Sequence, residues 1–247
     1  MTRTVASLCF ILLFAVVSAS AQTTKPWTEW SRKDAEKTLN DSAWAQTQTE
    51  TDTSQMTYSP TVTPTTASRR EDSRVSETGK TETGANNSPV SVKYRVRLLS
   101  AKPVRAAFAR MVQLQQEKPN EALATQLQAF VNREFDEYIV VAVAVDSSDQ
   151  KSSRVALQSL TMATPETLKN IAYLERKDGK RLVLMDYRAP GPDGMGAKFI
   201  FQRKLDGNLF LTPDSDNFRF VVEFNEKFKV AARYKVSAMT YEGKLEY

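Results

Sequence analysis

The chain has 247 residues, of which 41% are hydrophobic and 26% are charged, and its formal net charge is +5. It contains no histidine, which excludes histidine-based acid–base catalysis, histidine-dependent catalytic triads and histidine-ligated zinc or copper. The charge excess is too small for a nucleic-acid interface, which requires clustered lysine and arginine, so we expect no nucleic-acid partner.

Residues 1–21 have the features of a secretory signal peptide. Arg3 precedes an apolar run from Val5 to Val17, which is shorter than the ~20 residues of a membrane-spanning helix. The run is followed by Ala19-Ser20-Ala21, the small-residue pattern that signal peptidases cut, so we expect cleavage before Gln22. The alternative is an uncleaved membrane anchor, which the well-placed small residues disfavour.

Removal of this segment also removes Cys9, the only cysteine. The mature chain then forms no disulfide and depends on packing alone, which favours a bacterial envelope or secreted protein over a eukaryotic extracellular one. We therefore expect an exported protein that is periplasmic, outer-membrane-associated or secreted. After the signal is removed, the sequence contains no transmembrane segment.

Residues 22–45 contain all three tryptophans and are predicted to form a short helix. Ser31 is a favourable N-cap, and Asp34 three positions later gives a variant of the capping box. A helix of about ten residues is marginal in water and needs a surface to dock on. Either the helix packs on its own domain, or the tryptophans bind a separate envelope protein or surface. The candidate partner-binding residues are Trp27, Trp30 and Trp44.

Residues 46–89 are predicted to be a disordered linker. They include 18 serines and threonines among 44 residues, and few apolar residues. Such a composition does not bury enough apolar surface to offset the loss of chain entropy on folding. The remaining residues, 90–247, have the size of one ordinary domain.

This domain is predicted to begin with an alternating strand over 92–98. Lys93, Arg95 and Arg97 share one face of that strand. The ordinary interpretation of this basic face is a solvated outer surface. The functional alternative is contact with an acidic polymer or partner, which would be sensitive to salt.

Two helices are expected next, near 103–117 and 120–135, because apolar residues recur there at helical spacing. Pro119 separates them, since proline does not continue a helix interior. The continuous apolar run over 138–145 then predicts a central strand that is covered on both faces.

The second half of the domain is predicted to be mainly β. Residues 153–163 fit a strand or a helix, and Thr164-Pro165-Glu166 indicates a short helical turn. Asp178-Gly179 and Asp206-Gly207 are typical of two-residue hairpin turns. The expected strands lie near residues 172–177, 180–187, 197–205, 208–211, 218–224 and 228–236, with the last two joined at Asn225-Glu226. The predicted fold class is α+β: an antiparallel sheet with an inserted helix pair, preceded by the tryptophan-rich helix and the linker.

No residue is assigned a catalytic, cofactor-binding or metal-binding role, and no cofactor is expected. The glycine-rich segment 191–196 precedes a predicted strand rather than a helix, so a loop is favoured over a phosphate site. The acidic segments 146–149 and 214–217 lack the spacing of a calcium loop and lie at strand ends, where they favour turns.

The segment Lys25-Pro26-Trp27-Thr28-Glu29-Trp30-Ser31, closing with Asn40-Asp41-Ser42-Ala43-Trp44-Ala45, resembles the start of secreted bacterial proteins with Trp-x-x-Trp-Ser and Asp-Ser-x-Trp-Ala patterns. The ending from Tyr241 to Tyr247 is also similar to endings in that group. Some members are labelled GWxTD-domain proteins, although this chain has no Gly-Trp-x-Thr-Asp string. The resemblance implies an exported protein and assigns no functional residue.

The leading hypothesis is a non-enzymatic envelope or secreted protein that acts through protein or surface contact. A domain that binds a small ligand or a polymer is the first alternative. A carboxylate-dependent hydrolase is the second, because paired carboxylates are recognised by their separation in space and not by their sequence spacing.

Overall fold

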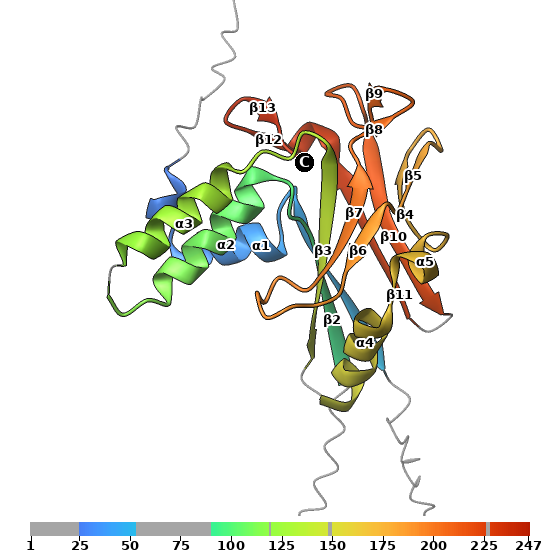
Figure 1. Cartoon of the computed structure of the whole chain (residues 1–247), viewed down its shortest axis with the longest axis horizontal. Coiled ribbons are helices and arrows are strands. Elements are labelled where there is room, and N and C mark those ends of the chain that lie inside the picture. Colours follow the sequence, from blue (N-terminus) through green and yellow to red (C-terminus); the bar gives the residue numbers. More distant parts are fainter. Residues whose placement is uncertain (1–24, 53–89, 119, 148–149, 226–227) are drawn as a thin grey trace, which may run out of the picture.

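The computed structural model describes residues 25–52, 90–118, 120–147, 150–225 and 228–247. The predicted signal peptide, and the part of the predicted linker over 53–89, lie outside the described residues. The described residues form an α+β fold of helices and antiparallel sheets (Figure 1). The predicted fold class is therefore confirmed.

Two antiparallel sheets form the body of the fold. The first has the strand order β1-β2-β3-β7-β6, and the second has the order β11-β10-β4-β5. The first sheet contains β1 (Ala45–Asp52), β2 (Val90–Leu98), β3 (Tyr138–Ser147), β7 (Ala197–Gln202) and β6 (Asp186–Arg188). The second contains β11 (Phe228–Lys235), β10 (Asn217–Asn225), β4 (Ala172–Arg176) and β5 (Arg181–Val183). Two short hairpins join β8 (Lys204–Leu205) to β9 (Asn208–Leu209) and β12 (Thr240–Tyr241) to β13 (Lys244–Leu245).

The two sheets pack face to face through aromatic side chains. Phe199 of β7 lies against Phe220 of β10, with ring centroids 5.1 Å apart. Tyr94 of β2 stacks on Phe228 of β11 at 5.2 Å. All four side chains are buried, so the main core lies between the sheets, as in other sandwich folds.

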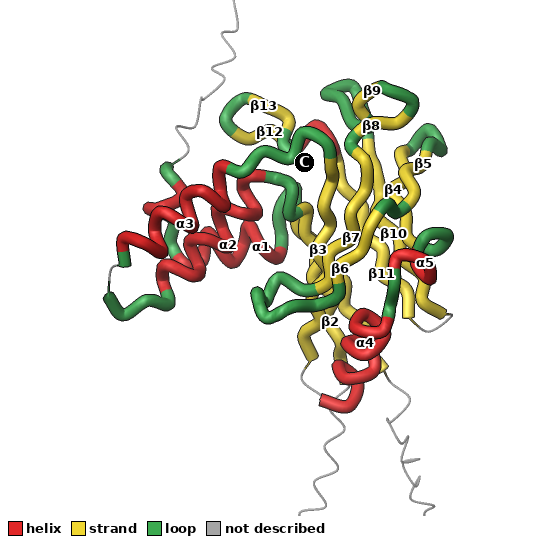
Figure 2. Tube along the Cα trace, viewed as in Figure 1, coloured by secondary structure: helices red, strands yellow, loops and turns green. Residues whose placement is uncertain are grey.

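The longer helices form two groups outside the sheets (Figure 2). α1 (Arg32–Asn40) packs on α2 (Lys102–Leu114), which packs on α3 (Glu121–Asn132). α2 and α3 are the predicted helix pair, inserted between β2 and β3. α4 (Gln150–Met162) and α5 (Pro165–Leu168) follow β3, so the segment 153–163, which fitted a strand or a helix, is helical up to Met162. The described residues also include two 3-10 turns, η1 (Trp27–Glu29) and η2 (Val236–Ala238).

The predicted start of α1 is confirmed at the level of its cap. The Ser31 hydroxyl accepts a hydrogen bond from the Asp34 N–H at 3.1 Å, and the Ser31 N–H donates to the Asp34 carboxylate at 3.1 Å. This reciprocal pair satisfies two backbone N–H groups at the helix start, those of Ser31 and Asp34. The helix ends at Asn40, with Asp41 as its C-cap.

The predicted boundary between the tryptophan-rich segment and the linker is wrong. Residues 45–52 form β1, which pairs with β2 in antiparallel register from Ala45 opposite Arg97 to Asp52 opposite Val90. β1 has the sequence AQTQTETD, so it carries almost no apolar side chain. Its polar composition suggested a linker, whereas backbone pairing holds it at the edge of the first sheet.

Side chains of β1 also join the two sheets. Gln46 donates from Nε2 to the carbonyl of Arg233 on β11 and accepts at Oε1 from the Arg233 N–H at 3.2 Å. Gln48 donates to the Lys229 carbonyl at 2.9 Å and accepts from the Ala231 N–H at 2.8 Å. Each glutamine amide thus bonds to β11 as a neighbouring strand would. We call this contact the glutamine seam.

The predicted strand 180–187 is two strands in different sheets. β5 ends at Val183 in the second sheet, and β6 begins at Asp186 in the first, so the chain crosses between the sheets at Leu184 and Met185. A single apolar run concealed this crossing, because both strands direct side chains into the same core. The turn before β5 has three residues rather than two, since the Arg176 N–H donates to the Lys180 carbonyl at 2.9 Å.

Candidate functional site

The three tryptophans predicted to bind a partner lie against their own domain. Trp27 is 7% exposed and packs in a small cluster with Ala106 and Ala109 of α2 and Leu127 and Val131 of α3. Of the two alternatives for the tryptophan-rich segment, the structure shows packing on the same chain. For Trp27 this finding replaces the alternative of a separate partner, because α2 and α3 cover the side chain.

The other two tryptophans are partly buried and hydrogen-bonded within the chain. The indole N–H of Trp30 donates to the Lys25 carbonyl at 2.9 Å. The indole N–H of Trp44 donates to the Glu246 carbonyl at 2.8 Å, and its ring meets Tyr241 edge-on. Partner binding by these residues stays a prediction, and the tryptophans are not the most accessible candidate site.

A polar cleft of about 650 Å³ lies between the start of α2, the end of α3 and the C-terminal hairpin. Arg105, which is 3% exposed, occupies its inner wall. Its guanidinium donates to the backbone carbonyls of Leu99, Ser100, Val131 and Arg133. Burial lowers the pKa of Arg105 to about 10. These contacts place its positive charge at the carboxyl end of α3, where the helix dipole favours a cation.

Further charged groups of the cleft are also engaged within the chain. Lys102 donates from its backbone N–H to the Glu246 carboxylate at 3.1 Å and from its ammonium to Glu242 at 2.7 Å. Arg203 lies over the Tyr247 ring at 3.7 Å and donates to the carbonyls of Phe135 and Tyr247. The cleft therefore holds residues 241–247 against the domain, and we assign these cations a structural role.

A second set of cations lies on the outer face of the second sheet. The strand registers align Arg181 of β5, Glu175 of β4, Arg219 of β10 and Arg233 of β11 in one line across four strands. We call these four residues the arginine row. Glu175 accepts from Arg181 at 2.6 Å and from Arg219 at 2.5 Å. One carboxylate thus lies among three guanidinium groups.

The row is accessible and has an excess of positive charge. The side chains of Arg181 and Arg219 are 53% and 43% exposed, and Arg233 is also exposed. Within the described part of the chain, no ion pair of Arg233 is recorded, and it lies directly opposite the like-charged Arg219. Like charges in this position repel. The hydrogen bond from Arg181 lowers the pKa of Glu175, so this carboxylate is ionised at neutral pH.

The same face carries more cations than the row alone. The outward side chains of β4, β5, β10 and β11 include five cations and two carboxylates, an excess of three positive charges. The cations are Arg181, Arg219, Lys229, Arg233 and Lys235, and the carboxylates are Glu175 and Glu223. A cavity of about 400 Å³ adjoins the row, and Glu175, Arg219 and Arg233 line it.

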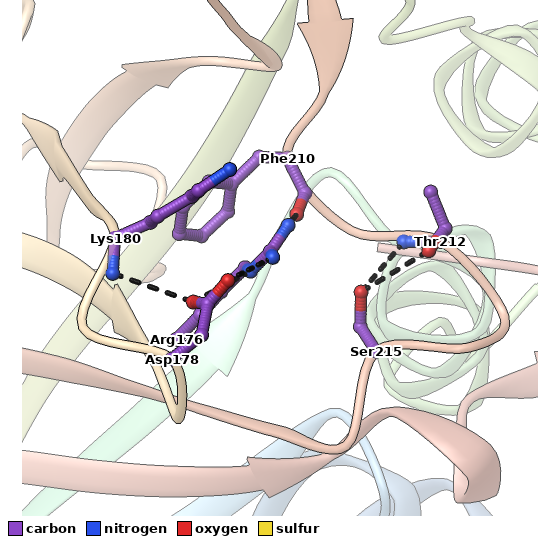
Figure 3. Close-up of polar contacts among 6 residues, drawn as sticks. All are labelled: Arg176, Asp178, Lys180, Phe210, Thr212 and Ser215. Atoms are coloured by element: carbon purple, nitrogen blue, oxygen red, sulfur yellow. Dashed lines mark hydrogen bonds and ion pairs between the residues drawn. The ribbon is translucent and has the colours of Figure 1, made fainter.

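The turn beside this cavity is held in place by a neighbouring arginine (Figure 3). Arg176 pairs with Asp178 and donates to the Phe210 carbonyl at 2.9 Å. The Lys180 N–H donates to Asp178 at 3.3 Å, and Ser215 accepts from the Thr212 N–H at 3.0 Å. These bonds fix the β4–β5 turn and the loop before β10, so the end of the arginine row has a defined shape.

The other segments singled out from the sequence have structural roles. Arg97 is buried beneath the end of α1, where it donates to the Leu39 carbonyl at 2.7 Å. Arg95 pairs with Asp146 at 2.5 Å. The expectation of a solvated basic strand face is therefore wrong for Arg97, because α1 covers it.

The glycine-rich segment 191–196 is a loop between β6 and β7, as predicted. Gly196 has φ +90°, and an added Cβ there would overlap the Val143 carbonyl. This position requires glycine because the loop approaches β3 closely. Part of the acidic segment 146–149 lies outside the described residues. Residues 214–216 lie in the loop before β10, and Asn217 is the first residue of that strand. The described residues contain no cluster of three or more potential metal ligands.

The arginine row has no signal in the linear sequence. Its residues lie at positions 175, 181, 219 and 233, and only the strand registers bring them into line. The signal that was available is the alternation of β11, where every second residue from Lys229 to Lys235 is exposed and three of those four are cationic. A basic outer face was predictable for β11 alone.

Comparisons with known proteins add no function. No family model matches the chain, and no curated protein matches it. A solved structure described as a novel protein of unknown function from Burkholderia pseudomallei is similar over 57% of this chain and 74% of that chain, with 11% sequence identity and a TM-score of 0.40. None of the described helices has the length and apolar character that a membrane span requires. The resemblance to secreted GWxTD-domain proteins stays a prediction.

Proposed function

We propose that this chain is an exported, non-enzymatic protein that makes contact with an acidic polymer or anionic surface through the arginine row. The accessible excess of cations on one sheet face is the observation that carries this proposal. Export rests on the signal-like residues 1–21. N-terminal sequencing of the protein from its native host tests that part, and a start at Met1 or Thr2 would contradict it.

The row suits a repeating anion better than a single small one. Its guanidinium groups lie along a line across four strands, and each can donate two parallel hydrogen bonds to a carboxylate, phosphate or sulfate. Glu175 holds Arg181 and Arg219 in place, while Arg233 has the positive charge that remains available. An anionic chain lying across the strands would relieve the repulsion between Arg219 and Arg233.

Binding of this kind depends on salt, because small ions compete with exposed charges. We expect the purified protein to bind dextran sulfate, with affinity that falls as sodium chloride is added, and not to bind neutral dextran. The double variant Arg219→Gln/Arg233→Gln should bind dextran sulfate about tenfold more weakly, which corresponds to about 1.4 kcal/mol.

A matched control removes the same charge elsewhere. Lys33 and Lys37 are exposed on α1, away from the second sheet, so Lys33→Gln/Lys37→Gln should retain the affinity within about twofold. Equal weakening in both double variants would show that net charge, and not the row, determines binding. Absence of binding at low salt would reject the proposed function.

A further inference from the structure

The sandwich has a second feature, a groove that shares only Arg181 with the arginine row. On the side opposite the glutamine seam, a groove of about 570 Å³ runs between β5 and the end of β7, with α5 contributing to its lining. Its lining includes Pro165, Lys169, Val183, Met185, Gln202 and Lys204. Backbone groups from both sheets border this groove.

β5 presents unpaired backbone groups along its outer edge. The Arg176 N–H donates to the Lys180 carbonyl, and hydrogen-bonded pairs alternate along an antiparallel ladder. Leu182 therefore bonds to Leu174 on β4, while Arg181 and Val183 direct their N–H and carbonyl groups away from β4. Within the described residues, no backbone partner is recorded for the N–H or the carbonyl group of either Arg181 or Val183. Two donors and two acceptors are thus available at the edge.

The first sheet also borders the groove, through the backbone of Gln202 at the end of β7. The Met185 N–H donates to the Ile200 carbonyl at 2.9 Å, and the Arg203 N–H donates to the Glu137 carbonyl at 2.8 Å. By the same alternation, Gln202 directs its backbone away from β3 and toward the side on which β6 lies. β6 begins at Asp186, opposite Ile200, and does not reach Gln202.

The side chains that line the groove combine apolar surface with an excess of one positive charge: the cations are Lys169, Arg181 and Lys204, and the carboxylates are Glu166 and Asp206. Val183 is 61% exposed and Met185 is 43% exposed. Lys169 and Lys204 are exposed, and no ion pair is recorded for either within the part of the chain that the structure describes. Glu166, the nearby carboxylate of α5, has a pKa that is lowered by hydrogen bonds to its own backbone and to Thr164. Glu166 is therefore ionised at neutral pH and contributes one negative charge to the lining.

We propose that an extended segment of another protein, with alternating apolar and acidic residues, adds to β5 as a fifth strand of the second sheet. Its backbone would bond to Arg181 and Val183, which is the mode of recognition that free sheet edges support. Its apolar side chains would cover Val183 and Met185, and its carboxylates would face Lys169 and Lys204. A second copy of this chain fits less well, because it would bring the same basic residues together.

The test uses a fluorescent peptide of alternating valine and glutamate, with a valine–lysine peptide as its control. We expect the wild-type protein to bind the glutamate peptide, with slower hydrogen exchange at the amides of Arg181 and Val183 in the complex. Val183→Pro removes an outward N–H without removing a bond to β4, so it should weaken binding about tenfold or more. Val183→Thr keeps that N–H and should stay within about twofold.

Two further arms keep the test decisive. If Val183→Pro does not fold, as judged by circular dichroism, a glutamate peptide with alternate N-methylated amides is offered to the wild-type protein, and its failure to bind supports strand addition. Lys169→Glu/Lys204→Glu should reverse the preference between the two peptides.

Binding that survives both N-methylation and Val183→Pro would overturn the proposal. A homodimer that Val183→Pro dissociates would also overturn it, in favour of a second copy. The glutamate peptide is also a candidate ligand of the arginine row, so Arg219→Gln/Arg233→Gln, which leaves the groove intact, separates the two proposals. This variant should bind the peptide within about twofold of the wild-type protein, and loss of binding would assign the peptide to the row.

Discussion

The two edges of the second sheet, at β11 and at β5, differ in whether other groups of the chain bond to their backbone. On one side, β11 would be a free edge, but the amides of Gln46 and Gln48 bond to its backbone. On the other side, no described strand pairs with the outer edge of β5 at Arg181 and Val183, which lies beside a groove of mixed apolar and charged lining. A free strand edge invites pairing with other chains. The contrast indicates that one edge is protected and that the other is available.

Two glutamines of β1, Gln46 and Gln48, account for the difference between the two edges. A glutamine side chain carries the donor and acceptor of a peptide group, and two glutamines spaced two residues apart match the spacing of outward groups on β11. The open side has no such pair, and Val183 and Met185 are left exposed. Substitutions of Trp27, of the two glutamines of the seam and of Glu175 in the arginine row test this contrast.

The largest effect is expected from the anchor of the protected side. Trp27 fastens the N-terminal segment to α2 and α3, and that segment leads into β1 and its glutamines. Trp27→Ala should lower the free energy of unfolding by about 3 kcal/mol or more, because it leaves a large cavity. Val183→Ala, on the open side, should change it by less than about 0.5 kcal/mol. Urea unfolding measures both, and similar small losses would mean that the N-terminal segment docks only weakly.

A smaller effect is expected from the seam itself. Gln46→Ala/Gln48→Ala removes four hydrogen bonds and should cost about 1–3 kcal/mol, since part of the β11 backbone loses its partners while water reaches the rest. Thr49→Ala alters an exposed residue of the same strand and serves as the control. Size-exclusion chromatography should show more self-association for the glutamine variant alone. Equal behaviour of the two variants would contradict a protective seam.

The smallest effect concerns the pH dependence of the arginine row. The folded protein lowers the pKa of Glu175 below its usual value of 4.5, chiefly through the hydrogen bond from Arg181. The stabilisation from Glu175 is therefore complete above pH 4.5 and is lost as the pH falls through the lower, folded-state value. Glu175→Gln should flatten that acid-range loss while changing neutral-pH stability only slightly. Thermal melts over the acid pH range measure this loss of stability. If the variant loses stability with falling pH as the wild-type protein does, Glu175 does not contribute to the pH dependence.

The elements that the sequence predicted well have strong local signals. Ser31 and Asp34 marked the start of α1, and the apolar run over 138–145 marked β3. β1 was missed because its stability comes from pairing and from glutamine amides, neither of which requires apolar residues. α4 was ambiguous because Val155 and Leu157, which blur its helical pattern, are exposed.

The candidate sites required information that local patterns do not contain. The arginine row depends on the register of four strands, and β5 and β6 were merged because the chain crosses between sheets within one apolar run. The tryptophans were correctly seen to need a surface. Composition alone did not distinguish a partner's surface from that of α2 and α3, since both would be apolar.

The glutamine seam also bears on the order in which the chain folds. Gln46 and Arg233 are 187 positions apart, so their contact closes a loop that includes most of the protein. The entropy lost in closing a loop rises with its length, and long-range contacts of this kind slow folding. We therefore expect the seam to close after β10 and β11 have paired, so that the edge of β11 is unprotected until then. We expect the chain to be most prone to aggregate in the time between those two events.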